Sequence, residues 1–287
     1  FRLLTDLASE RQLRRLERIA TALPAAYGSR FALEPGDLDA SWVVLFSRRD
    51  EYARFAGSLA AAADRPLAGH ALPGLAALPE SGGPEATAQL LVHELAHLLH
   101  RAAGLPPLPP WLEEGMANDL AFSKMDSAGR LALDTVSGSA FMSEARLPVT
   151  IVDLGASKQT ARIHPPEEQI WGNEMFHYAG ALASLKELVA TVAARRATPL
   201  PALLSMPAAE FARGEGFAER YAQSAFFVRF LLDDARPHRA AAFRAFLAWT
   251  GAGRPATPEE LARTLDASLS DLEPEFHAWL AMQAEGL

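Results

Sequence analysis

The segment that most constrains this chain is His93-Glu94-Leu95-Ala96-His97. On a helix, side chains four positions apart project from the same face, so His93 and His97 can hold one zinc ion between them. This pattern of two histidines and a glutamate arises by chance in only roughly one chain of this length in a hundred. The segment therefore predicts a metal-binding helix of the kind found in zinc hydrolases.

The residues around this motif predict one long helix over residues 84–103. Pro84 suits a first helical position, and Gly104 followed by Pro106 indicates the end. Most of this helix should be buried, because leucines make the segment strongly apolar. Buried histidines and a glutamate need partners, and one zinc ion would serve all of them. Two alternatives remain, namely ordinary histidines without a metal, or a structural ion without catalysis.

A third protein ligand is expected downstream, since a catalytic zinc keeps three protein ligands and one open position for water. The proline-rich stretch 104–110 cannot continue the first helix, while Pro110 suits the first turn of a second helix that packs back against it. That turn carries Glu113 and Glu114. We predict Glu114 as the third ligand, with Glu113 as its rival, because sequence alone does not fix the phase of the helix.

Two motifs now stand together: His93-Glu94-x-x-His97 and Trp111-Leu112-x-Glu114-Gly115-x-Ala117. They resemble the motifs of the gluzincin metallopeptidases, which include the aminopeptidase N-type enzymes. More closely, the chain resembles an uncharacterised bacterial family of peptidase-MA-like domains of unknown function. In that family an α/β segment precedes the zinc helix and a helical segment follows it. The resemblance extends to both ends of the chain, although the zinc motif is the specific part.

The resemblance implies a role for each motif residue. His93, His97 and Glu114 would bind one Zn²⁺ ion, with water in the fourth position. Glu94 would be the general base, taking a proton from that water during attack and returning it to the leaving group. The implied function is that of a zinc-dependent peptidase acting on a peptide or protein substrate. The alternative is a catalytically inactive gluzincin-like zinc domain that binds a protein or envelope partner.

Amide hydrolysis also needs a donor for the developing oxyanion, and related peptidases often take a tyrosine or histidine from the C-terminal helical part. Tyr221, at the head of the apolar segment 221–232, is the first candidate, although a core tyrosine is as common there. His177 and Tyr178 compete with it. The chain lacks the Gly-x-Met-Glu-Asn motif by which aminopeptidase N-type enzymes recognise a free amino terminus. The choice between endo- and exo-cleavage therefore stays open.

Zinc-bound histidines usually donate their second ring N–H to an oxygen. Asn118 or Asp119, a turn beyond Glu114, is expected to supply one. Many gluzincins have an acidic residue four positions after the glutamate, where this chain has Asn118, so Asp119 stays open. His100 lies roughly 10 Å along the helix axis from His93, so one ion cannot easily bind it together with both motif histidines. We expect His100 to be a structural residue.

Composition limits the partners. The net charge of −8, without a basic block, argues against nucleic acid. The absence of cysteine excludes disulfides and thiol catalysis. No stretch approaches the roughly 20 apolar residues of a membrane span. The chain begins at Phe1 without a methionine, and the resemblance favours an exported protein, periplasmic or lipoprotein-anchored, whose leader has been removed.

The expected fold is α+β and mainly helical, with a thermolysin-like zinc-helix core, a small N-terminal α/β part and a helical C-terminal lobe. Three parts are expected: residues 1–122 with the zinc helices, an irregular or hairpin excursion over 123–168, and the lobe over 169–287. The first part should contain a helix over 6–24, a strand over 41–47, a helix over 48–61 and an edge strand within 69–80. The lobe should contain helices near 171–195, 217–233, 237–250 and 270–284.

Overall fold

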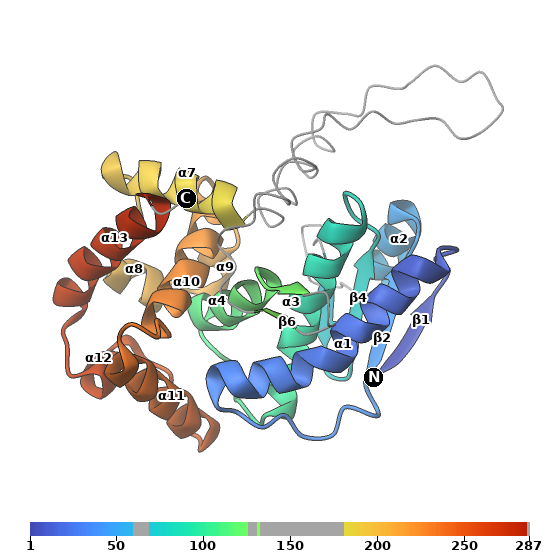
Figure 1. The fold of residues 1–287 in the computed structure, drawn as a ribbon, viewed down its shortest axis with the longest axis horizontal. Coiled ribbons are helices and arrows are strands. Elements are labelled where there is room, and N and C mark those ends of the chain that lie inside the picture. Colours follow the sequence, from blue (N-terminus) through green and yellow to red (C-terminus); the bar gives the residue numbers. More distant parts are fainter. Residues whose placement is uncertain (60–68, 126–130, 133–180, 286–287) are drawn as a thin grey trace.

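The structure is a computed structural model that describes residues 1–59, 69–125, 131–132 and 181–285. It is mainly helical with one four-stranded sheet, so the coarse prediction of a mainly helical α+β fold is confirmed (Figure 1). The sheet lies on one side of two central helices, and most of the C-terminal helices lie on the other (Figure 1). None of the described helices is long and apolar enough to cross a membrane.

The sheet is built from short strands in the order β1-β2-β4-β3. Strands β1 (Arg2–Thr5), β2 (Trp42–Phe46) and β4 (Leu75–Pro79) are parallel, and β3 (His70–Leu72) runs antiparallel to β4 at the edge. Alternate residues face opposite sides, as in any strand. Val43 and Leu45 of β2 join the main core, while Val44 and Phe46 pack with the smaller cluster around Tyr52.

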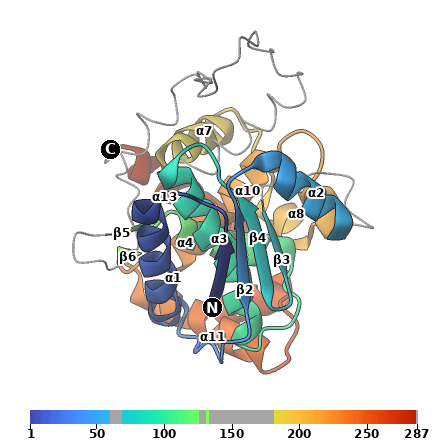
Figure 2. The ribbon, with the colours of Figure 1, turned by 90° about the vertical axis from the view of Figure 1, so that its right-hand side faces the viewer.

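Helices cover both faces of this sheet (Figure 2). Helix α1 (Glu10–Phe31) adds Leu16 and Leu23 to the main core, and α2 (Arg49–Leu59) brings Tyr52 to the other face. The predicted end of α1 at residue 24 is wrong, because the helix continues through Pro24. The completely buried rings of Tyr27 and Phe31 explain why this last part stays helical.

The segment over 69–80 forms a hairpin whose first strand, β3, is the edge strand expected there. Pro73 lies between β3 and β4 beside Gly74, whose φ of 73° suits a tight turn. Strand β4, the second strand of the hairpin, is interior, and the edges of the sheet are β1 and β3. Pro79 is the last residue of β4, and its missing N–H does not end the pairing with β2, because the next backbone N–H, that of Glu80, donates to the carbonyl oxygen of Phe46 at 2.6 Å.

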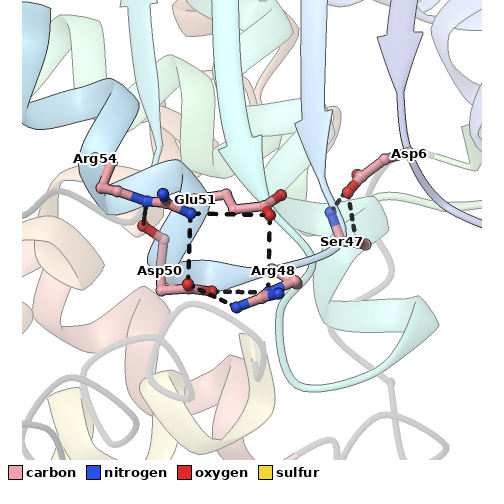
Figure 3. A network of polar contacts seen from close by, with 6 residues as sticks. All are labelled: Asp6, Ser47, Arg48, Asp50, Glu51 and Arg54. Carbon is pink, nitrogen blue, oxygen red and sulfur yellow. Dashed lines mark hydrogen bonds and ion pairs between the residues drawn. The ribbon is translucent and has the colours of Figure 1, made fainter.

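A small polar network ties the ends of β1 and β2 together (Figure 3). Asp6 accepts hydrogen bonds of 2.7 Å from both the backbone N–H and the hydroxyl of Ser47. Next to it, Arg48 pairs with Asp50 at the start of α2, and Asp50 also contacts Arg54. These groups are exposed, so water weakens their attraction and the network contributes little to stability.

The helix predicted over 84–103 is confirmed, since α3 runs from Pro84 to Ala102, and the predicted start of the second helix at Pro110 is confirmed as well, since α4 runs from Pro110 to Ala121. Helix α4 packs against both α3 and α10 (Phe217–Leu231). A Cβ atom added to Gly115 would lie 2.8 Å from the carbonyl oxygen of Ser224, so the glycine permits this close approach of α4 and α10.

The C-terminal part is helical, as predicted. Its predicted helices near 217–233, 237–250 and 270–284 correspond to α10, α11 and α13, while residues 171–180 lie outside the described part. Three short helices, α8, α9 and α12, had no counterpart in the prediction. The remaining bounds are β5 Lys124–Met125, β6 Leu131–Ala132, α7 Ala181–Ala193, α8 Leu200–Ser205, α9 Ala208–Phe211, α11 Pro237–Gly251, α12 Pro258–Leu265 and α13 Leu269–Glu285.

Candidate metal centre

His93 and His97 face one another on α3. Both are buried, at 8% and 7% exposure, and their Nε2 atoms are 3.2 Å apart. The predicted helix phase, with the two histidines one turn apart on one face, is therefore what the structure contains. Both Nε2 atoms point into the same small space between α3 and α4.

Glu114 completes this arrangement from α4. Its Oε2 atom lies 3.3 Å from His93 Nε2 and 3.8 Å from His97 Nε2. Ligand atoms that bind zinc tetrahedrally at about 2.0–2.2 Å are about 3.3–3.5 Å from one another, so the three separations are close to those of a zinc site. Glu114 Oε2 is also buried with no hydrogen-bond partner among the described residues. These three side chains could hold one metal ion.

Helix α4 also supplies the atoms behind the two histidines. His93 Nδ1 lies 2.9 Å from Asn118 Oδ1, and His97 Nδ1 lies 3.4 Å from Glu113 Oε1. When an Nδ1–H donates to an oxygen, the lone pair of Nε2 is left for a metal. Glu114 therefore lies on the Nε2 side of both rings, whereas Glu113, the other candidate for the third ligand, lies on the Nδ1 side of His97. Asn118 is the residue that contacts His93, as one of the two alternatives predicted.

Asp119 was expected, as an alternative to Asn118, to accept from a motif histidine, but it forms buried ion pairs with two arginines. Its carboxylate pairs with Arg30 of α1 at 2.8 Å and with Arg229 of α10 at 2.9 Å. All three side chains are at most 5% exposed. Burial alone would raise the pKa of Asp119, but the two arginines outweigh it and hold the pKa below its usual value. Asp119 thus fastens α4 between the N-terminal part and the C-terminal helices, one residue from Asn118.

The site is electrostatically suited to a cation. Burial alone would lower the pKa of His97, but Glu114, Glu113 and Glu94 together raise it to about 9. Burial alone would raise the pKa of Glu114, and the neighbouring His97 and His93 lower it. The carboxylates therefore stabilise positive charge between α3 and α4. Without a metal ion, this positive charge is that of protonated His97. A divalent ion must displace that proton.

Glu94 lies beside the edge strand. A Cβ atom added to Gly69, the residue before β3, would lie only 2.5 Å from Glu94 Cδ, so the carboxylate rests against the glycine backbone. The next residue, His70, has its Nδ1 2.6 Å from the hydroxyl of Tyr52. Burial, and then the charge of Glu94, raises the pKa of Tyr52, which keeps its hydroxyl neutral. Burial raises the pKa of Glu94 itself.

The neighbours Gly69, His70 and Tyr52 were not predicted as parts of this site. Gly69 and Glu94 are far apart in sequence, and they meet only because β3 folds back along β4 next to α3. A glycine immediately before a short strand is too common a pattern to indicate contact with Glu94. The contact between Gly69 and Glu94 follows from the order of the strands in the sheet, and no sequence motif indicates it.

Tyr221 lies in the second turn of α10 and is partly buried. Its ring centroid is 4.9 Å from that of Phe211 and 6.3 Å from that of Phe217, so it belongs to an aromatic cluster beside α9. These contacts agree with the alternative expectation for Tyr221, namely a tyrosine packed in the hydrophobic core. His177 and Tyr178, the other oxyanion candidates, lie outside the described residues.

No protein-family model, curated protein or solved structure gives a significant match to this chain.

Proposed function

We propose that this protein is a zinc-dependent peptidase of the gluzincin type. The observation that carries the proposal is the meeting of His93, His97 and Glu114 within metal-binding distance, with Glu94 on the same helix turn. A site that only bound a structural ion would have no use for a buried glutamate beside its histidines. The proposal includes the gluzincin-like core, a bacterial origin and an exported protein, which the motif resemblance favours.

In this proposal His93 and His97 hold Zn²⁺ through Nε2, and Glu114 holds it through its carboxylate. When bound, zinc lowers the pKa of a coordinated water toward neutrality and polarises a carbonyl. Asn118 Oδ1 accepts from His93 Nδ1 and so fixes the orientation of that ring, and the Glu113 carboxylate lies 3.4 Å from His97 Nδ1. Each of the two histidine ligands thus has a second side chain of α4 on its far side.

Glu94 takes the proton of the attacking water on its carboxylate and passes it to the departing amine. A buried carboxylate with a raised pKa is better matched to this task than an exposed one, because a general acid–base group works best with a pKa near the working pH. The contact with Gly69 restricts where this carboxylate can lie. The Glu94 carboxylate is therefore held in a restricted position before the substrate binds.

The substrate is a peptide or protein segment in extended form. Strand β3 pairs with β4 on one side and is one of the two edge strands of the four-stranded sheet. An extended peptide can add to such an edge through backbone hydrogen bonds, and β3 would place it next to Glu94. Tyr221 is proposed as a donor to the oxyanion, with His177 and Tyr178 as alternatives.

The proposal is tested with Glu94→Gln, which removes the base and retains the size of the side chain. A mixed peptide library is incubated with zinc-loaded protein, and cleavage is followed by mass spectrometry. We expect Glu94→Gln to bind zinc as before and to lower turnover about 10²–10⁴-fold. Glu85→Gln, in the first turn of the same helix, is the matched control and should retain full turnover.

Equal turnover of Glu94→Gln and the unmodified protein, with both fully loaded, would contradict the mechanism. If zinc binds and the unmodified protein cleaves nothing in the library, the peptidase proposal fails. The site then belongs to a zinc domain that binds a protein or envelope partner.

A further inference from the structure

His100 is a buried residue whose polar atoms are not satisfied. It lies on α3, close to one turn beyond His97, and only 2% of its surface is exposed. Neither ring nitrogen has a hydrogen-bond partner among the described residues. Buried polar atoms in folded proteins are nearly always satisfied by protein, water or an ion. His100 is therefore not explained by packing alone.

Potential metal ligands lie close to the imidazole of His100, which also packs near the ring of Tyr27. His97 Nδ1, also buried without a hydrogen bond among the described residues, lies 3.4 Å from Glu113 Oε1. One ligand atom from each of His97, His100 and Glu113 lies within 4.8 Å of the others. The 3.4 Å separation equals that of two ligands on a tetrahedral zinc. The other separations are at most 4.8 Å, so a shift of up to about 1.4 Å brings them to the same value.

We propose that His97, His100 and Glu113 form an alternative position for Zn²⁺ or a similar divalent ion, next to the first one. Two imidazoles and a carboxylate are ligands that suit zinc.

The two positions compete because they share His97. Its Nε2 faces His93 and Glu114, whereas its Nδ1 faces Glu113. A neutral imidazole has one nitrogen with a free lone pair and one that carries a proton. His97 therefore binds one ion at a time, on one side of its ring or on the other. The protein holds one ion in total, and loss of a ligand from the first position moves the ion to the second.

The test uses His93→Ala, which removes a ligand of the first position and leaves the second complete. We expect this variant to retain one equivalent of zinc. X-ray absorption at the zinc edge should then detect two imidazole ligands, from His97 and His100. The double variant His93→Ala/His100→Ala should bind zinc more weakly by more than the roughly 10–100-fold that loss of an outer-shell partner costs.

The matched control is His93→Ala/His238→Ala, which removes a histidine on α11 outside both sets and should bind zinc like His93→Ala. Glu114→Gln provides a second route if His93→Ala does not fold, since it also spares His97, His100 and Glu113. Equal zinc affinity with and without His100, or a single imidazole at the zinc of His93→Ala, would overturn the proposal. The test needs no substrate, so its result is separate from that of the peptidase proposal.

Discussion

Gly69→Ala probes Glu94, the proposed general base, without altering any of the proposed metal ligands. In the structure a Cβ atom at position 69 would lie 2.5 Å from Glu94 Cδ, whereas carbon atoms in contact are about 3.5–4.0 Å apart. The carboxylate of Glu94 or the start of β3 must therefore move by about 1 Å or more. A misplacement of 1 Å can lower the rate of an enzyme about 10²-fold, because the reacting groups are no longer aligned.

We expect Gly69→Ala to lower turnover about 10²-fold while its zinc content stays at that of the unmodified protein. Turnover on the peptide library and zinc by elemental analysis would be measured on the same samples. Gly57→Ala is the matched control, because a Cβ atom added to Gly57 in α2 has no neighbour within 4 Å. Alanine in a helix is more stable than glycine by roughly 0.5–1 kcal/mol, so this control should be fully active and slightly more stable.

Full turnover in Gly69→Ala would refute the reasoning, since it would mean that the position of Glu94 against β3 has no part in catalysis. Loss of zinc together with turnover would refute it in another way. The glycine would then support the metal site as a whole and not the base.

Three further predictions follow from the residues around α4. Asp119→Asn leaves Arg30 and Arg229 buried without their counter-charge, so urea unfolding should give a free energy of unfolding lower by about 3–5 kcal/mol at pH 7. The folded state lowers the pKa of Asp119, so the stability that its carboxylate contributes is present above about pH 4 and is lost as the pH falls further. The difference in free energy of unfolding between the unmodified protein and Asp119→Asn should therefore shrink in acid. A difference that stays constant with pH would contradict this. Asn118→Ala removes the oxygen behind His93, and a zinc titration should give an affinity about 10–100-fold weaker with the fold retained; unchanged affinity would mean that the 2.9 Å contact does not support the ligand.

Local features of the fold were predictable from sequence because they depend on nearby residues. Pro84 and Pro110 mark the starts of α3 and α4, and the spacing of His93 and His97 sets the phase of the first helix. Sequence alone did not decide between Glu113 and Glu114 as the third ligand, because both lie in the same turn of α4. The structure separates them by which side of the His97 ring each one faces.

Contacts between distant segments could not be predicted in this way. Asp119 lies 89 residues from Arg30 and 110 residues from Arg229, and no local pattern pairs them. The hairpin over β3 and β4 shows the same limit, since an edge strand was expected within residues 69–80 and only the order of the strands shows that β3 is at the edge and β4 is interior. The contact between Gly69 and Glu94 depends on that order as well.

The central claim is that His93, His97 and Glu114 hold one zinc ion, and zinc content tests it most directly. Purified protein, reconstituted with zinc and freed of excess metal, would be compared with His97→Ala by elemental analysis. His97 belongs to both metal positions, so its loss removes a ligand wherever the ion lies. The account predicts close to one zinc per chain in the unmodified protein and almost none in His97→Ala. No zinc in the reconstituted protein, or the same zinc content in both proteins, would contradict it.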